Sequence, residues 1–203
     1  MRVRLWYASG VPASSLRDVT HDNFGFLIAY VVPGVIVVWG VSYVSPTVAG
    51  WFAAGTTDAA TIGGFLYVTI ASVAAGMFVS AIRWLVIDTL HHRTGVPKPA
   101  WDFARLQDNL AAFQTVVEHQ YRHYQFYSNS LVSLAFLYGV RRVALESDLR
   151  QIVAETAAFA AVGTMFFVAS RDNLHRYYER TNAMLASAAP RRRRRSDRRS
   201  RAK

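Results

Sequence analysis

Histidine is the residue type whose spacing in this sequence comes nearest to a chemical site. Six histidines occur in the 203 residues. His119 and His123 are four residues apart, so they would share one face of a helix. Asp88 and His92 have the same spacing, and imidazole and carboxylate groups are common ligands of zinc and iron. The candidate metal ligands are Asp88, His91, His92, His119, His123 and His175.

These histidine fragments, HH, HxxxH and a lone histidine, resemble parts of the histidine boxes of membrane fatty-acid hydroxylases and desaturases. The resemblance implies a metalloenzyme with iron or zinc that acts on lipid at the cytoplasmic membrane face. It covers only these short pieces, because those enzymes carry a fuller set that includes HxxHH, which this sequence lacks. Histidine and tyrosine also make ordinary headgroup contacts at membrane surfaces, and we favour that interpretation, with no cofactor.

A polar stripe runs along one predicted helix. The stretch EHQYRHYQFYSNS, residues 118–130, leads directly into the apolar stretch LVSLAFLYGV. Spacings of four, three, four and four place its polar residues on one helical face. The stripe consists of Glu118, Arg122, Gln125, Asn129 and Ser133. Polar groups at membrane depth need protein or water beside them, so we favour a packing seam over a conduction or substrate path.

Glu155 is the one acid in the last apolar segment, residues 152–170. If that segment pairs antiparallel with the preceding one about a turn near residue 146, Glu155 lies level with Tyr138 and close to Arg141. The sequence leaves two states open: a protonated acid bonded to the Tyr138 hydroxyl, or a carboxylate paired with arginine. Either state would be structural in our preferred interpretation, with a proton relay as the alternative.

Long apolar segments position these residues. A membrane-spanning helix needs about 20 mainly apolar residues. Four segments meet or approach that length, namely residues 24–44, 62–87, 124–140 and 152–170. The fold class predicted is therefore all-α, a polytopic membrane protein with four transmembrane helices and a cytoplasmic helical extension of the third. For the last two segments, a pair of buried soluble helices or a shallow hairpin is the alternative.

The second segment carries a small-residue face, and the first contains a proline. Ser72, Gly76 and Ser80 are spaced by four, which allows close backbone approach of a neighbouring helix. Pro33 lacks an N–H group and should kink the first segment, which membrane helices tolerate.

Residues 88–123 are predicted to form a cytoplasmic linker followed by an amphipathic helix. Asp102 is a candidate N-cap, and no glycine or proline interrupts the sequence from there to Tyr138. Apolar residues recur at helical spacing in this stretch: Phe103, Leu106, Leu110, Phe113 and Val117. We expect this docking stripe to bind a cytoplasmic protein partner, with the helix either projecting from the membrane or lying along its surface.

Basic residues indicate the orientation. Placing both termini in the cytoplasm of a prokaryotic inner membrane puts 20 of the 23 lysines and arginines inside, and only Arg141, Arg142 and Arg150 outside. The cytoplasmic parts would then be an arm at 1–23, a helix at 171–190 and a disordered polybasic tail at 191–203. That tail holds nine basic residues and one aspartate, which suits contact with anionic lipid. It has no interleaved aromatic residues, so nucleic acid is not an expected partner.

These patterns predict a class of function but no reaction. The expected role is a non-catalytic membrane component of an assembly: a scaffold, a sensor or a membrane-perturbing effector that self-associates. The alternatives are the histidine-based metalloenzyme and a small oligomeric channel or transporter. There is no cysteine, which excludes disulfides and thiolate metal sites. Phosphate-cradling glycine loops, HExxH and GxSxG are also absent from the sequence.

Overall fold

A computed structural model describes residues 25, 27–53, 62–101, 110–146 and 148–187 of the chain. Within these ranges the regular structure is helical and contains no strand, which confirms the all-α prediction. The elements, where η marks a π-helix, are η1 (Leu27–Val31), α2 (Val32–Ser42), α3 (Pro46–Ala53), α4 (Ile62–Arg83), η2 (Trp84–Asp88), α5 (Thr89–Arg93), α6 (Leu110–Val116), η4 (Val117–Tyr121), α7 (Arg122–Ala144) and α8 (Leu149–Ser187). The predicted arm at 1–23 and tail at 191–203 lie outside the described residues.

Two helical stretches are long and apolar enough to cross a membrane. They are Gly63–Arg93, which comprises most of α4 with η2 and α5, and Leu149–Ala186 in α8. The stretches Leu27–Ser42 and Pro46–Ala53 would make a third span only if both count as one, and they meet at an angle of 119°. The helix α7, predicted as a span, is not among these candidates. Its polar stripe and terminal arginines lower its mean hydropathy.

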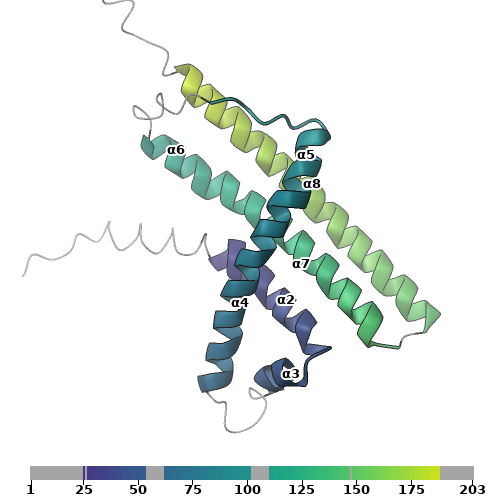
Figure 1. Ribbon diagram of the computed structural model, residues 1–203. Helices are drawn as coiled ribbons and strands as arrows, with labels where there is room; N and C mark the ends of the chain where they lie inside the picture. The colour runs from purple at the N-terminus through teal and green to yellow at the C-terminus, as the bar shows by residue number, and fades with distance from the viewer. Residues whose placement is uncertain (1–24, 26, 54–61, 102–109, 147, 188–203) are drawn as a thin grey trace, which may run out of the picture.

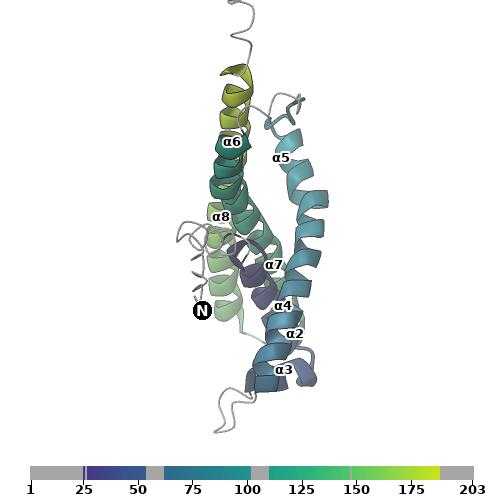
Figure 2. The ribbon, with the colours of Figure 1, turned by 90° about the vertical axis from the view of Figure 1, so that its left-hand side faces the viewer.

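The helices form two antiparallel pairs that pack on each other (Figures 1 and 2). The first pair is α2 with α4, and the second is α7 with α8. Helix α2 contacts both α4 and α7, and it runs parallel to α7 because Tyr30 lies beside Gln125 while Tyr43 lies beside Arg141. The chain therefore passes alternately between two ends, and the α7–α8 turn lies at the end opposite η2.

Glycines set the separation between α2 and α4. A Cβ atom at Gly76 would lie 2.0 Å from the Tyr30 carbonyl oxygen, and one at Gly34 would lie 1.8 Å from the Ser72 carbonyl oxygen. A real Cβ atom cannot lie this close to an oxygen, so this helix separation requires glycine at both 34 and 76. The small-residue face of the second segment thus packs on η1 and α2, with Ser72 and Gly76 buried and Ser80 half-buried.

One long helix leads into α7. Residues 110–144 form one continuous helix through α6, η4 and α7, in which Val117–Tyr121 adopts a π-helical turn. The predicted uninterrupted helix from Asp102 to Tyr138 therefore agrees with the structure from residue 110 onward, and its first turns lie outside the described residues. At 1.5 Å per residue this stretch is about 50 Å long.

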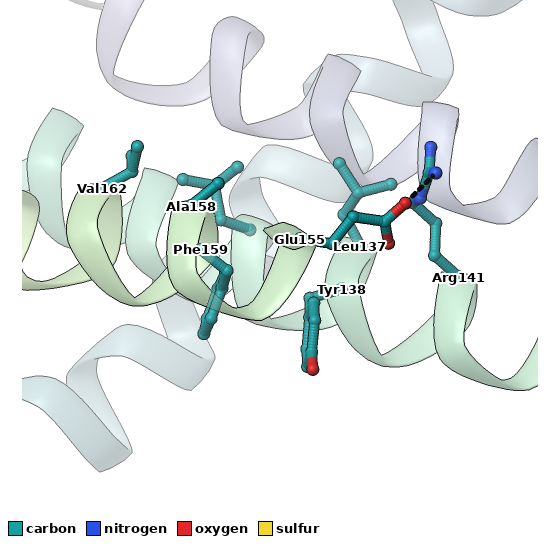
Figure 3. A pocket seen from close by; sticks show the side chains of 8 residues that line it. Leu137, Tyr138, Arg141, Glu155, Ala158, Phe159 and Val162 are labelled. Carbon is teal, nitrogen blue, oxygen red and sulfur yellow. Dashed lines mark hydrogen bonds and ion pairs between the residues drawn. The ribbon is translucent and has the colours of Figure 1, made fainter. Parts of the chain in front are cut away.

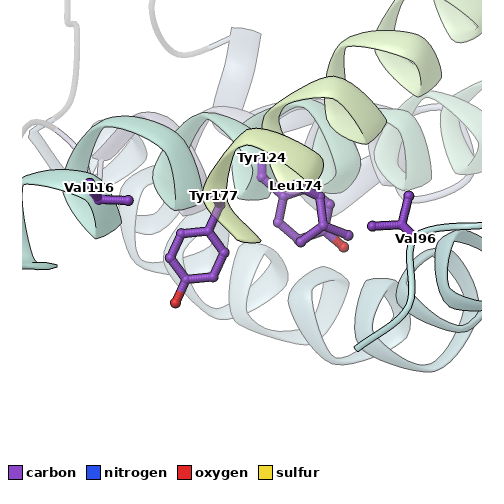
Figure 4. Packing of buried hydrophobic residues seen from close by; sticks show 5 residues of the cluster. All are labelled: Val96, Val116, Tyr124, Leu174 and Tyr177. Carbon is purple, nitrogen blue, oxygen red and sulfur yellow. The ribbon is translucent and has the colours of Figure 1, made fainter. Parts of the chain in front are cut away.

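The ends of α6 and α8 beyond the other helices form a small packed unit, here called the headpiece (residues 89–101, 110–121 and 171–187). Its core consists of Val96, Val116, Leu174 and Tyr177, together with Tyr124 of the adjoining α7 (Figure 4). Gly95, with φ of 106°, turns the chain after α5, and the Val96 N–H donates to the His91 carbonyl across that turn. Trp101 Nε1 then donates to Asn182 Oδ1 at 2.7 Å, so this segment is fixed along α8.

We expect Gly76→Ala to lower the unfolding temperature of the detergent-solubilised protein. The added methyl group would meet the backbone of Tyr30, and overpacking of this kind costs about 1–3 kcal/mol. Gly139→Ala is the matched control, because a Cβ at Gly139 has no neighbour within 4 Å and alanine favours helix by up to about 1 kcal/mol. Thermal unfolding followed by circular dichroism measures both. Equal effects of the two substitutions would contradict the close α2–α4 contact.

Candidate functional site

The polar stripe of α7 faces the protein interior. Gln125, Asn129 and Ser133 are buried, and Arg122 is half-buried. Gln125 Nε2 donates to the Tyr30 hydroxyl at 3.1 Å, and Arg122 Nη1 donates to Gln125 Oε1 at 3.1 Å. Ser133 Oγ donates to the carbonyl of Asn129 in its own helix. Glu118 belongs to η4, and its side chain lies outside the described residues. The described residues of the stripe therefore line the contact of α7 with η1 and α2.

A hydrogen bond made by Asn129 explains why α7 needs a polar residue in this stripe. Its Nδ2 donates to the Ala29 carbonyl oxygen at 2.8 Å, and both residues are fully buried. Ala29 is four residues before Pro33, which has no N–H to offer that carbonyl. A buried carbonyl without a partner is costly, about 1–3 kcal/mol. Asn129 thus supplies from α7 the donor that proline removes from the first helix.

An ion pair between Arg83 of α4 and Asp88 of η2 lies against Tyr124 of α7. Arg83 Nη1 contacts Asp88 Oδ1 at 3.1 Å, and the Tyr124 hydroxyl donates to the same carboxylate oxygen. The guanidinium also lies over the Tyr124 ring, 5.1 Å from its centroid. Arg83 is 4% exposed and Tyr124 is fully buried. A charge at such a position is tolerated only when it is paired and hydrogen-bonded, so the three groups form one structural unit.

His91 and Ser170 form a second buried contact, with His91 Nε2 and Ser170 Oγ 3.0 Å apart. A histidine beside a serine is the arrangement that activates a nucleophile in many hydrolases. The Ser170 hydroxyl can also donate to the Phe167 carbonyl at 2.8 Å, and it then accepts from His91 Nε2–H. His91 in that tautomer cannot act as a base toward Ser170. Both side chains are also fully buried, which makes the pair a link between α5 and α8.

The structure separates the other candidate metal ligands. Among the described residues, no group of three or more histidine, aspartate or glutamate side chains could hold a metal ion. His92 Nε2 bonds the Tyr178 hydroxyl at 3.0 Å, and Asp88 is engaged by Arg83 and Tyr124. The remaining three histidines are exposed, His123 and His119 within one helical turn and His175 beside Glu179 at 3.5 Å.

Glu155 is a carboxylate paired with arginine. Its Oε1 lies 2.8 Å from Arg141 Nη2, and its Oε2 contacts Arg142. Tyr138 instead bonds Thr156 Oγ1 at 2.7 Å, so the alternative of a protonated acid on Tyr138 does not occur. Arg141 Nη1 also donates to the Tyr43 hydroxyl at 2.9 Å. Burial lowers the pKa of Arg141, but Tyr43 and Glu155 raise that pKa by more, so Arg141 remains positively charged.

Part of the docking stripe packs within the protein itself. Phe113 and Val117 pack against the headpiece core, whereas Leu110 is 56% exposed. Phe103 and Leu106 lie outside the described residues. Of the three described members, therefore, only Leu110 presents a mainly exposed side chain to a partner, because the other two pack against the headpiece core.

The Arg83–Asp88–Tyr124 unit is the feature that sequence patterns miss. Side chains five residues apart do not meet on an α-helix, where spacings of three and four bring neighbours together. Between Arg83 and Asp88 the chain forms the π-helix η2, which has i to i+5 bonds and a wider turn. The only sequence signal was an arginine directly after a charge-free apolar stretch.

The fold and site define a helical protein with two helices apolar enough to cross a membrane and polar groups that bind one another between helices. No protein family, curated protein or solved structure matches this sequence.

We expect Asn129→Ala to destabilise the protein by about 1–3 kcal/mol, because it leaves the buried Ala29 carbonyl without its donor. In a Pro33→Ala background the same substitution should cost less, because residue 33 then offers its own N–H to Ala29. Denaturant unfolding of the four variants gives the coupling energy directly.

Asn173→Ala is the matched control for this cycle. Asn173 Nδ2 bonds the Ala169 carbonyl of its own helix at 2.8 Å, where no proline removes the helical donor. Loss of this bond should lower the free energy of unfolding only slightly in either background. An Asn129→Ala cost that is independent of residue 33 would refute the proposed relation between Asn129 and Pro33.

Proposed function

We propose that this chain is an integral inner-membrane protein that acts as a non-catalytic component of an assembly, carrying a rigid headpiece at the cytoplasmic surface. The observation that carries the proposal is the division of α8. Its first half is apolar and largely exposed, whereas Leu174, Tyr177 and Thr181 of its second half are buried in or beside the headpiece. The helix is uninterrupted over 39 residues, so the two halves move as one body.

Exposed apolar surface supports membrane insertion. Phe65 of α4 is 77% exposed, Phe78 is 70% exposed, and Val153 of α8 is 60% exposed. Water contact with such surface costs about 25 cal/mol per Å². Bilayer hydrocarbon or neighbouring protein removes that cost, and about 20 residues of each helix suffice to cross the bilayer.

The proposed topology has four passes, with both termini in the cytoplasm. The alternation of α2, α4, α7 and α8 puts the headpiece and η2 at one end and the α7–α8 turn at the other (Figure 1). The polar stripe does not preclude α7 from crossing the membrane, because Gln125, Asn129 and Ser133 bond within the protein. The arginines near the turn, Arg141 and Arg142, pair with Glu155.

Reporter fusions test this topology. Alkaline phosphatase, which is active only outside the cytoplasm, should be active when fused after Glu146 in the α7–α8 turn. A fusion after Lys98 in the headpiece should instead be inactive, and the corresponding fluorescent-protein fusion should fluoresce. Matching signals at Glu146 and Lys98 would exclude a crossing by α7 and α8.

Self-association is the second part of the proposal. The first half of α8 packs mainly on α7, and its outer face carries small exposed residues at helical spacing: Ala157, Ala161 and Thr164. Small residues permit close packing of a second membrane helix. Anionic lipid, through the basic tail, and a cytoplasmic protein at the headpiece near Leu110 are the further partners proposed.

Single-cysteine crosslinking in native membranes tests self-association, and the natural absence of cysteine leaves no background. We expect Ala161→Cys to form an oxidised dimer, because disulfides require Cα atoms within about 7 Å. Ser133→Cys, which is buried between α7 and the first helix, is the control and should not crosslink.

Native mass spectrometry in mild detergent provides the second measurement. A discrete oligomer is expected there. A strictly monomeric particle, together with no crosslink at Ala157, Ala161 or Thr164, would refute a self-associating assembly component.

A further inference from the structure

A pocket of about 360 Å³ lies between α7 and α8, close to the turn that joins them (Figure 3). This volume falls within the range of roughly 300–1,000 Å³ that small-molecule sites occupy. Its lining residues come from both helices at spacings of three, one and three. They are Leu134, Leu137, Tyr138 and Arg141 of α7, and Glu155, Ala158, Phe159 and Val162 of α8.

The pocket has one polar end and one apolar end. Arg141 and Glu155 lie together at the end nearest the turn, and their ion pair is drawn in Figure 3. Leu134 and Val162 lie at the other end. Leu134 is seven residues from Arg141 and Val162 is seven residues from Glu155, which corresponds to about 10 Å along each helix. Tyr138 and Phe159 stack with centroids 4.9 Å apart and form one side. This shape fits an amphiphile whose tail lies along the helices.

The guanidinium of Arg141 at the polar end suits a phosphate group. Both Arg141 and Arg142 contact the carboxylate of Glu155. Arginine has five N–H donors in a planar fork that matches phosphate oxygens. Arg141 uses Nη1 and Nη2 for Tyr43 and Glu155 and holds a fixed orientation, so it presents a preorganised cation beside the pocket.

We propose that this pocket binds one acyl chain of a phospholipid, with the lipid phosphate beside Arg141. The apolar stretch of α8 begins near this level, so a lipid headgroup in the leaflet opposite the headpiece would lie at the depth of Arg141. The inference requires α8 to be in the bilayer but is independent of self-association and of partner docking.

Photolabelling of the full chain in lipid nanodiscs tests the proposal. The probe is phosphatidylglycerol with a diazirine in one acyl chain, and tandem mass spectrometry locates the label. We expect labels on Leu134, Leu137 and residues 158–162. Ala158→Phe, which fills the pocket, should lower this labelling by about tenfold, because several methylene groups lose their site. Leu134→Phe fills it from α7 and provides a second variant should the first fail to fold.

Val153→Phe is the matched control, because Val153 lies on the exposed face of α8 and outside the pocket. It should leave labelling unchanged. A diacylglycerol probe with the same photoreactive chain separates the phosphate contribution from the chain contribution. It should label less than phosphatidylglycerol, and Arg141→Gln should remove that difference.

Three results would overturn the proposal. Labels spread evenly over the exposed faces of α4 and α8 would indicate ordinary bilayer contact. Pocket labelling that folded Ala158→Phe and Leu134→Phe proteins retain would place the chain elsewhere. Crosslinking of a second copy's helix to Ala158→Cys would show that protein occupies the pocket instead.

Discussion

The hydrogen bond from Asn129 to the Ala29 carbonyl is the interaction on which the helix arrangement depends. Pro33 has no N–H to donate to this carbonyl, and a buried carbonyl without a partner is costly. The amide from α7 therefore fixes the lateral position of α2 on α7. A polar residue 100 positions away in sequence thus stabilises the proline-containing helix. The polar character of Gln125, Asn129 and Ser133 thus has a packing cause.

Close backbone contact fixes α4 on the other side of the first helix. Gly34 and Gly76 let the backbones of α2 and α4 approach without intervening side chains, and this brings η2 toward α7. Arg83, Asp88 and Tyr124 then meet in a buried unit, and His91 reaches Ser170 of α8. These contacts connect the apolar helices to the headpiece. Most of the residues at this end whose side chains could form a reactive site are therefore bonded to one another.

Some of this could be predicted from the sequence, and the limits have physical reasons. Helical periodicity placed Gln125, Asn129 and Ser133 on one face, and antiparallel pairing placed Glu155 beside Arg141 and Tyr138. The pattern could not distinguish an ion pair from a protonated acid, because that depends on side-chain directions at the helix ends. Nor could periodicity foresee that Phe113 and Val117 would pack against the headpiece core, since an apolar stripe has the same spacing whether a partner or the chain itself covers it.

By itself the sequence determined the helical class, the two apolar helices α4 and α8, and the uninterrupted path from residue 110 into α7, because these follow from local hydropathy and spacing. Only the tertiary structure decided which groups meet across helices: Asn129 with Ala29, Arg83 with Tyr124, and Glu155 with both Arg141 and Arg142. It also decided the pocket between α7 and α8. Such contacts depend on π-turns, glycine contacts and helix crossing, which are set by packing between distant segments and leave no period in the sequence.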